Sequence, residues 1–200
     1  MKSARIPQKL FPREYAAYFH PSADKSSSEC GVVQDWLQSR FWRKKKARQS
    51  IECRVNPNDP PDVVWTDTRG RKHAFEVTEI VDGKFIQEAK LARSCQHREY
   101  SRDEIEAIVR EYVTKKSKAR FKGGPYYKKY LLIYTDEAFV AFGPAEQYLR
   151  EMQKIETTDF NEVWAVMPPP VRPLQTEGDI SYCRLIRLSR RHANRVHGSQ

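Results

Sequence analysis

The sequence predicts an α/β protein in which helices flank a mixed β-sheet. Helical and strand patterns alternate along the chain, and an antiparallel meander of three strands stands near its start. Hydrophobic residues make up 39% of the chain and aromatic residues 12%, which indicates a packed core. The length of 200 residues is typical of one domain. We expect residues 25–190 to form this domain, with an N-terminal arm over residues 1–24 and a basic tail over residues 191–200.

The first helix is expected over residues 27–46. Ser26, Ser27 and Ser28 offer N-cap side chains, and apolar residues follow at helical spacing: Val32, Val33, Trp36, Leu37 and Phe41. Glu29 would lie in the first turn, where the helix dipole alone favours an acidic residue. A role for Glu29 in a functional site is the open alternative.

Three strands are expected next, the first of them over residues 51–55. The second and third, over residues 60–65 and 73–80, flank the polar turn 67–72 and therefore predict a hairpin. Asp62 begins the second strand, and Glu76 lies in the middle of the third.

Alternation along the third strand assigns its side chains to two faces. Glu76 and Thr78 share one face, whereas Phe75 and Val77 take the other.

The second half of the chain continues the alternation of helices and strands. Ser101 with Glu104 forms a capping box, which predicts a helix over residues 101–120. Residues 130–134 predict a buried central strand. The other expected elements are a helix or lid from residue 85 to about 91, a helix over 146–151, and strands over 162–167 and 182–188.

The two carboxylates of the hairpin point to a metal site. A carboxylate within an apolar strand is costly to bury unless something binds it, and two such groups repel each other. A divalent cation would relieve both problems, and oxygen ligands suit Mg²⁺ or Mn²⁺. The alternative is a surface hairpin in which Asp62 is an exposed cap and Glu79, rather than Glu76, faces solvent.

Pro61-Asp62 followed by Glu76-Val77-Thr78 resembles the signature of the PD-(D/E)xK superfamily of restriction-endonuclease-like nucleases. The resemblance covers residues 25–135 in the order of elements: helix, three-stranded meander, helix, strand. It implies an αβββαβ core and a Mg²⁺- or Mn²⁺-dependent hydrolase that cleaves nucleic acid, with DNA as the expected substrate. Endonuclease and exonuclease activity both remain open, and many nucleases of this type form homodimers.

The resemblance also implies roles for particular residues. Asp62, Glu76 and the backbone carbonyl of Val77 would bind the metal ion. Glu29 matches a glutamate that the family often carries on the preceding helix, where it would hold a second ion or a water molecule.

The family has a lysine at the position of Thr78, and this lysine orients or activates the attacking water. Thr78 has no ammonium group, but its hydroxyl could form a hydrogen bond with the water. Lys90, on the segment after the hairpin, is the expected replacement, with Lys84 and Gln87 as alternatives. The missing lysine also leaves a second interpretation open, a nuclease-like module that binds nucleic acid without cleaving it.

The chain is strongly basic, with a formal net charge of +10. Clustered Lys and Arg side chains are typical of phosphate binding. Solvated surface faces and an acidic protein partner are the alternatives. The residues expected to bind nucleic acid are Arg43, Lys44, Lys45, Lys46, Lys115, Lys116, Lys118 and Arg120.

Aromatic residues beside the second basic cluster have two possible uses. Phe121, Tyr126, Tyr127 and Tyr130 could stack on unpaired bases or fill the core around the central strand.

Cysteine spacing and hydropathy bear on the cellular location. The four cysteines contain no Cys-x-x-Cys pair, so we expect reduced thiols and no zinc cluster. The sequence shows neither a signal peptide nor a membrane-spanning run. We therefore expect a cytoplasmic protein without a membrane partner.

Overall fold

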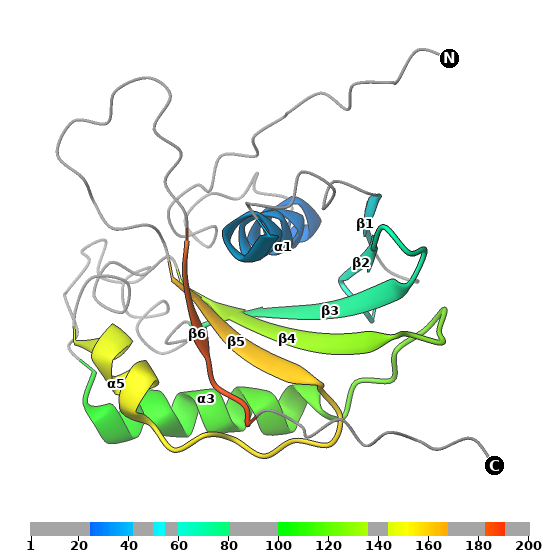
Figure 1. Cartoon of the computed structure of the whole chain (residues 1–200). Coiled ribbons are helices and arrows are strands. Elements are labelled where there is room, and N and C mark those ends of the chain that lie inside the picture. The colour runs from blue at the N-terminus through cyan, green and yellow to red at the C-terminus, as the bar shows by residue number, and fades with distance from the viewer. Residues whose placement is uncertain are drawn as a thin grey trace, which may run out of the picture.

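The computed structural model describes residues 25–41, 50–54, 60–80, 100–135, 144–167 and 183–190. All six strands of this part of the chain belong to one sheet (Figure 1). The elements are α1 (Lys25–Phe41), β1 (Ile51–Cys53), β2 (Val63–Thr66), β3 (Lys72–Glu79), α3 (Arg102–Lys116), β4 (Lys128–Tyr134), α5 (Ala145–Glu151), β5 (Glu162–Met167) and β6 (Arg184–Arg187).

The sheet is mixed, with the strands in sequence order from β1 to β6. β1, β2 and β3 form an antiparallel meander, β3, β4 and β5 are parallel, and β6 is antiparallel to β5. Parallel neighbours require a crossover connection, and α3 lies on the path from β3 to β4. In Figure 1, α1 covers one face of the sheet, while α3 and α5 cover the other. The predicted class, helices flanking a mixed β-sheet, is confirmed.

The two faces of β3 differ in the way its sequence predicts. Phe75 and Val77 pack with Trp36 of α1 in one buried cluster. Glu76 points to the opposite face, where its carboxylate meets Lys116 of α3. Leu131 and Ile133 of β4 lie in the buried cluster of that second face, together with residues of α3 and α5. The sheet therefore separates two hydrophobic cores, and Glu76 belongs to the α3 side.

The helix boundaries differ from the expected ones. α1 begins at Lys25, so no acidic residue lies in its first turn, and the helix dipole does not account for Glu29. The capping box of Ser101 and Glu104 is present, and α3 begins immediately after it. α3 ends at Lys116 rather than at residue 120, and the segment that follows it turns back toward the hairpin, where the Lys122 N–H donates to the Pro60 carbonyl.

Several expected features lie outside the described residues. They are the arm 1–24, the basic residues Arg43 to Lys46, the segment 85–91 with Lys90, and the tail 191–200. Within the part that the structure describes, none of the helices is both long and apolar enough to cross a membrane.

A disulfide joins α1 to the edge of the sheet, so the expectation of reduced thiols is wrong for two of the four cysteines. Cys30 of α1 and Cys53 of β1 are bonded, with their Cα atoms 5.7 Å apart and a separation of 23 positions in sequence. The packing of α1 against β1 and β2 brings the two together, which cysteine spacing alone does not reveal. Because disulfides persist mainly in oxidising compartments, the cysteines no longer support a cytoplasmic location.

Removing this disulfide should destabilise the protein. Cys53 is exposed, so Cys53→Ser leaves the buried Cys30 side chain in place. We expect the free energy of unfolding to fall by roughly 3 kcal/mol, the scale for opening a loop of this length. Urea denaturation with and without reductant measures this change. Reductant should lower the stability of the wild-type protein to that of the variant and leave the variant unchanged; a wild-type protein insensitive to reductant would contradict the bond.

Candidate active site

Asp62 couples the two strands of the hairpin. It lies immediately before β2 rather than within it, and its carbonyl accepts a 2.8 Å hydrogen bond from the Arg54 N–H. Val63 pairs with Phe75 in the antiparallel register, which brings Asp62 opposite Glu76. The Asp62 Oδ2 atom accepts a 2.7 Å hydrogen bond from the Val77 N–H, and only 2% of the residue is exposed. The surface-hairpin alternative, with an exposed Asp62, is therefore wrong.

Glu76 is also buried, with 4% of the residue exposed, and its charge is balanced by a lysine from α3. The Lys116 Nζ atom lies 2.6 Å from Glu76 Oε1. Lys116 stands in the last turn of α3, and 23% of its side chain reaches solvent. This ammonium group thus stands beside one of the two buried acids of the hairpin. The sequence prediction placed Lys116 only among the phosphate-binding residues.

Burial and neighbouring negative charges together perturb the pKa of Asp62 strongly. Burial, followed by the charges of Glu76 and Glu29, raises the pKa of the Asp62 carboxyl to about 8. The hydrogen bond from Val77 and the positive charge of Lys116 act in the opposite direction but do not cancel this effect. In the absence of a bound cation, Asp62 therefore keeps its proton at neutral pH while Glu76 is paired with Lys116.

Glu29 approaches the same place from α1. The residue is 6% exposed, and its charge contributes to the raised pKa of Asp62. In the described part of the chain, however, no three His, Cys, Asp or Glu side chains are grouped closely enough to hold a metal ion. The oxygen donors available to a cation are thus the Asp62 and Glu76 carboxylates and the peptide of Val77. Two buried carboxylates that raise a pKa by mutual repulsion fit a hard divalent cation.

Four of the remaining predicted residues lie in the described part of the chain. Thr78 follows Glu76 on the same face of β3 and is partly exposed. Lys115, Lys118 and Arg120 are exposed at and beyond the end of α3. Lys90 and the first basic cluster belong to segments outside the description, so their position relative to Asp62 stays a prediction.

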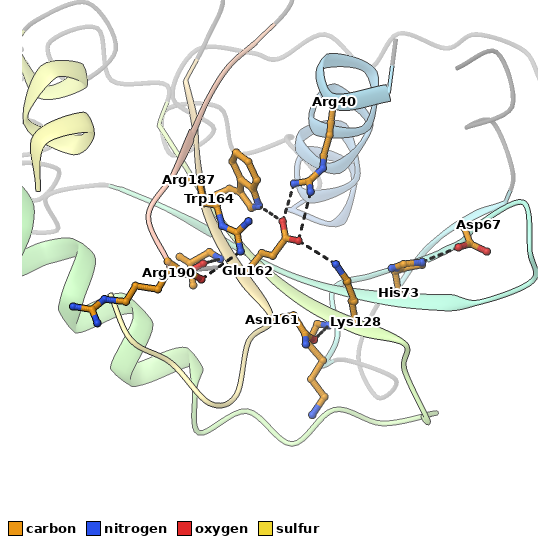
Figure 2. Close-up of polar contacts among 12 residues, drawn as sticks. Arg40, Asp67, His73, Lys128, Asn161, Glu162, Trp164, Arg187 and Arg190 are labelled. Atoms are coloured by element: carbon orange, nitrogen blue, oxygen red, sulfur yellow. Dashed lines mark hydrogen bonds and ion pairs between the residues drawn. The ribbon is translucent and has the colours of Figure 1, made fainter. Parts of the chain in front are cut away.

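A second buried carboxylate, Glu162, was not singled out by the sequence. Its oxygens contact Arg40 at 2.8 Å, Lys128 at 3.2 Å and the Trp164 indole N–H at 2.9 Å (Figure 2). Burial would raise the pKa of Glu162, but these charges and hydrogen bonds outweigh it and lower the pKa below its usual value. Because Arg40 belongs to α1, this cluster fastens α1 to the start of β5.

Comparison with known proteins adds no relative. No protein-family model, curated protein or solved structure matches the chain.

The raised pKa of Asp62 predicts a specific dependence of stability on pH. Between its normal value of 3.8 and about 8, the folded protein holds a proton that the unfolded chain has released. The stability of the wild-type protein should therefore decrease as the pH rises through this range. Asp62→Asn is neutral throughout and should become more stable than wild type above pH 8, by up to several kcal/mol, since one pKa unit equals about 1.4 kcal/mol.

Chemical denaturation in EDTA at a series of pH values tests this prediction, because chelation removes any cation that would stabilise the carboxylate. Parallel pH profiles for the two proteins would show that Asp62 titrates normally in the folded state.

Proposed function

We propose that this protein is a divalent-metal-dependent nuclease that hydrolyses phosphodiester bonds in nucleic acid, with DNA as the expected substrate. One observation carries the proposal: Asp62 and Glu76 are buried opposite each other on a hairpin, and the Lys116 ammonium group lies 2.6 Å from Glu76. Buried, perturbed titratable groups that converge from separate elements favour a catalytic site over a purely structural one.

The order and pairing of the elements support a restriction-endonuclease-like core. α1 precedes the antiparallel meander β1–β2–β3, α3 follows, and β4 then pairs in parallel with β3 (Figure 1). This is the αβββαβ order that the resemblance implies. The acidic residues stand at the corresponding places in that order, before β2 and within β3.

The carboxylates of Asp62 and Glu76 would hold Mg²⁺ or Mn²⁺, assisted by the Val77 carbonyl, and Glu29 would hold a metal-bound water. Such an ion supplies Lewis-acid stabilisation of the phosphate and a nucleophile at neutral pH. The Val77 N–H bond orients the Asp62 carboxylate within the hairpin. Burial of both acids keeps competing water away from the side chains.

Lys116 would perform the task of the lysine that Thr78 lacks. Its ammonium group stands beside Glu76 and is partly exposed, so it can contact a phosphate oxygen as negative charge develops there. Thr78, on the same strand face, would donate a hydrogen bond to the attacking water. Lys90 remains a second candidate for the positive charge.

The surface around Lys116 suits a polyanion. Lys115, Lys118 and Arg120 are exposed next to it, and each phosphate contact with such a side chain releases counterions. Nucleic acid is therefore the proposed partner, and the homodimer stays a prediction.

The second candidate function is a nuclease-like module that binds nucleic acid without hydrolysing it. Thr78 in place of lysine favours this candidate. It predicts salt-sensitive binding that does not require Asp62. The two functions thus differ in whether replacement of Asp62 affects anything beyond stability.

Cleavage assays on single-stranded and duplex DNA with Mg²⁺ or Mn²⁺ test the nuclease proposal. Asp62→Asn, Glu76→Gln and Lys116→Met should each lower kcat by roughly 100-fold or more, the scale for losing a group that stabilises developing charge. The matched control is Lys115→Met, at the exposed neighbouring position. It should raise KM at moderate salt and leave kcat within about threefold of wild type, because it would contact phosphate only.

Far-UV circular dichroism and thermal melting establish that each variant folds. Salt-sensitive DNA binding without cleavage under either ion would reject the nuclease in favour of the binding module. Full kcat in Lys116→Met, with loss in the two acid variants, would remove Lys116 from the mechanism and leave the metal site standing.

A further inference from the structure

Tyr127 is unusual among the described residues because it is a large hydrophobic side chain that lies on the surface. It is 53% exposed, and no other described large hydrophobic residue is exposed. Tyr130, three residues later, is buried in the core on the α1 side of the sheet. Of the aromatic residues expected either to stack on bases or to fill the core, Tyr127 is thus the one whose ring is presented to solvent.

The Tyr127 ring is held in place from several directions. Its backbone N–H donates a 2.8 Å hydrogen bond to the Lys72 carbonyl, which continues the pairing of β3 with β4. The guanidinium carbon of Arg71 lies 4.0 Å from the ring centroid, and the His73 ring meets it edge-on at 5.4 Å. An aromatic ring fixed in this way loses little conformational entropy when a ligand stacks on it.

Arg71 is itself fixed by the turn between β2 and β3. The Asp67 Oδ2 atom accepts a hydrogen bond from Arg71 Nε at 2.7 Å and lies 3.2 Å from His73 Nε2 (Figure 2 shows the Asp67–His73 contact). Asp67 Oδ1 accepts from the backbone N–H groups of Arg69 and Arg71. Asp67 is only 6% exposed, so its negative charge is enclosed by these donors and does not reach the surface. The turn therefore holds the guanidinium against Tyr127.

The charges around this pair are positive. Arg69 and Lys72 are exposed in the turn and at the start of β3. Arg71 is partly exposed, with 35% of its side chain accessible. An exposed aromatic ring among exposed cations is the arrangement that single-stranded nucleic acid binds, because the bases stack on the ring and the phosphates meet the cations.

Tyr127 and Arg71, which together form a stacking platform, lie near the strand that carries Glu76 but on its other face. The Tyr127 ring packs on His73, which shares a face of β3 with Phe75 and Val77, whereas Glu76 points toward α3. The Tyr127 backbone is hydrogen-bonded to Lys72. Lys72 and Glu76 are four residues apart on β3, which corresponds to about 13 Å along the strand. The segment that links Lys116 to Tyr127 passes beside the hairpin, where the Lys122 N–H donates a 2.8 Å hydrogen bond to the Pro60 carbonyl. A nucleic-acid strand that contacts both Tyr127 and the acidic pair must therefore pass from one face of the sheet to the other.

We propose that Tyr127, supported by Arg71, stacks on an unpaired base of the bound nucleic acid, so that the ligand is single-stranded at this point. The inference rests on the proposed function for the class of ligand, nucleic acid. Bases inside a duplex present only their edges to a protein, whereas every unpaired base offers a π-face. Stacking of this kind selects for strand state and not for sequence.

Equilibrium binding in EDTA tests the platform separately from cleavage. Fluorescence anisotropy is measured with three labelled DNAs of equal length: a single strand, the same strand with abasic sites in place of bases, and a duplex. Tyr127→Ala should weaken binding of the single strand about tenfold, the scale for losing one stacked base. The same variant should change binding of the abasic strand and of the duplex by less than about twofold.

Two variants serve as controls. Tyr127→Phe keeps the ring and should bind the single strand as wild type does. Arg102→Ala removes an exposed positive charge at the opposite end of α3 and should also leave binding unchanged.

The outcomes of this experiment test base stacking on Tyr127 independently of nuclease activity. Equal losses on all three DNAs, or no loss on the single strand, would overturn the stacking role even if the wild-type protein cleaves DNA. A selective loss on the single strand would support stacking even if no cleavage is found, because chelation removes catalysis from the measurement.

Discussion

The buried pairing of Asp62 and Glu76 is the constraint on which the rest of the site depends. Asp62 stands before one strand and Glu76 lies within the next, and the Val77 N–H holds the first acid against the second strand. Repulsion between buried carboxylates is costly, and the fold reduces it by keeping a proton on Asp62 and placing Lys116 beside Glu76. α3 thus has an electrostatic role as well as a packing one.

A comparison with Glu162 clarifies what is unusual about Asp62. Both carboxylates are buried, yet the pKa of Glu162 is lowered and that of Asp62 is raised. Glu162 receives two cations and an indole N–H, a balanced arrangement that joins α1 to β5. Asp62 faces two further acids instead. The first arrangement stabilises the fold without further ligands, whereas in the second the charges of the neighbouring acids favour the protonated form of Asp62.

Local sequence patterns were sufficient to predict part of this structure. The β2–β3 hairpin, the two faces of β3 and the capping box of α3 depend on residues close in sequence, and all three were predicted correctly. Contacts between distant residues were missed. Lys116 lies 40 residues from Glu76, and its position depends on where α3 ends and how the crossover packs.

The same limit applies to the two contacts that tie α1 to the sheet. Arg40 and Glu162 are 122 residues apart, and the pairing of Cys30 with Cys53 depends on the path of α1 over β1. No short sequence motif reveals either contact. The predicted end of α3 also differed from the observed one, because helix propensity and charge do not specify the residue at which a chain turns back to meet a neighbouring strand.

The separation of Lys116 from the hairpin has a consequence for protein synthesis. A nascent chain that has emerged only as far as β3 already contains both acids but lacks their counterion. Neutralisation of Glu76 must wait until the ribosome has released α3, and pairing of β4 with β3 then fixes the helix in place. Partial translation products that end before α3 would consequently lack the Lys116 ammonium group that lies beside Glu76 in the folded protein.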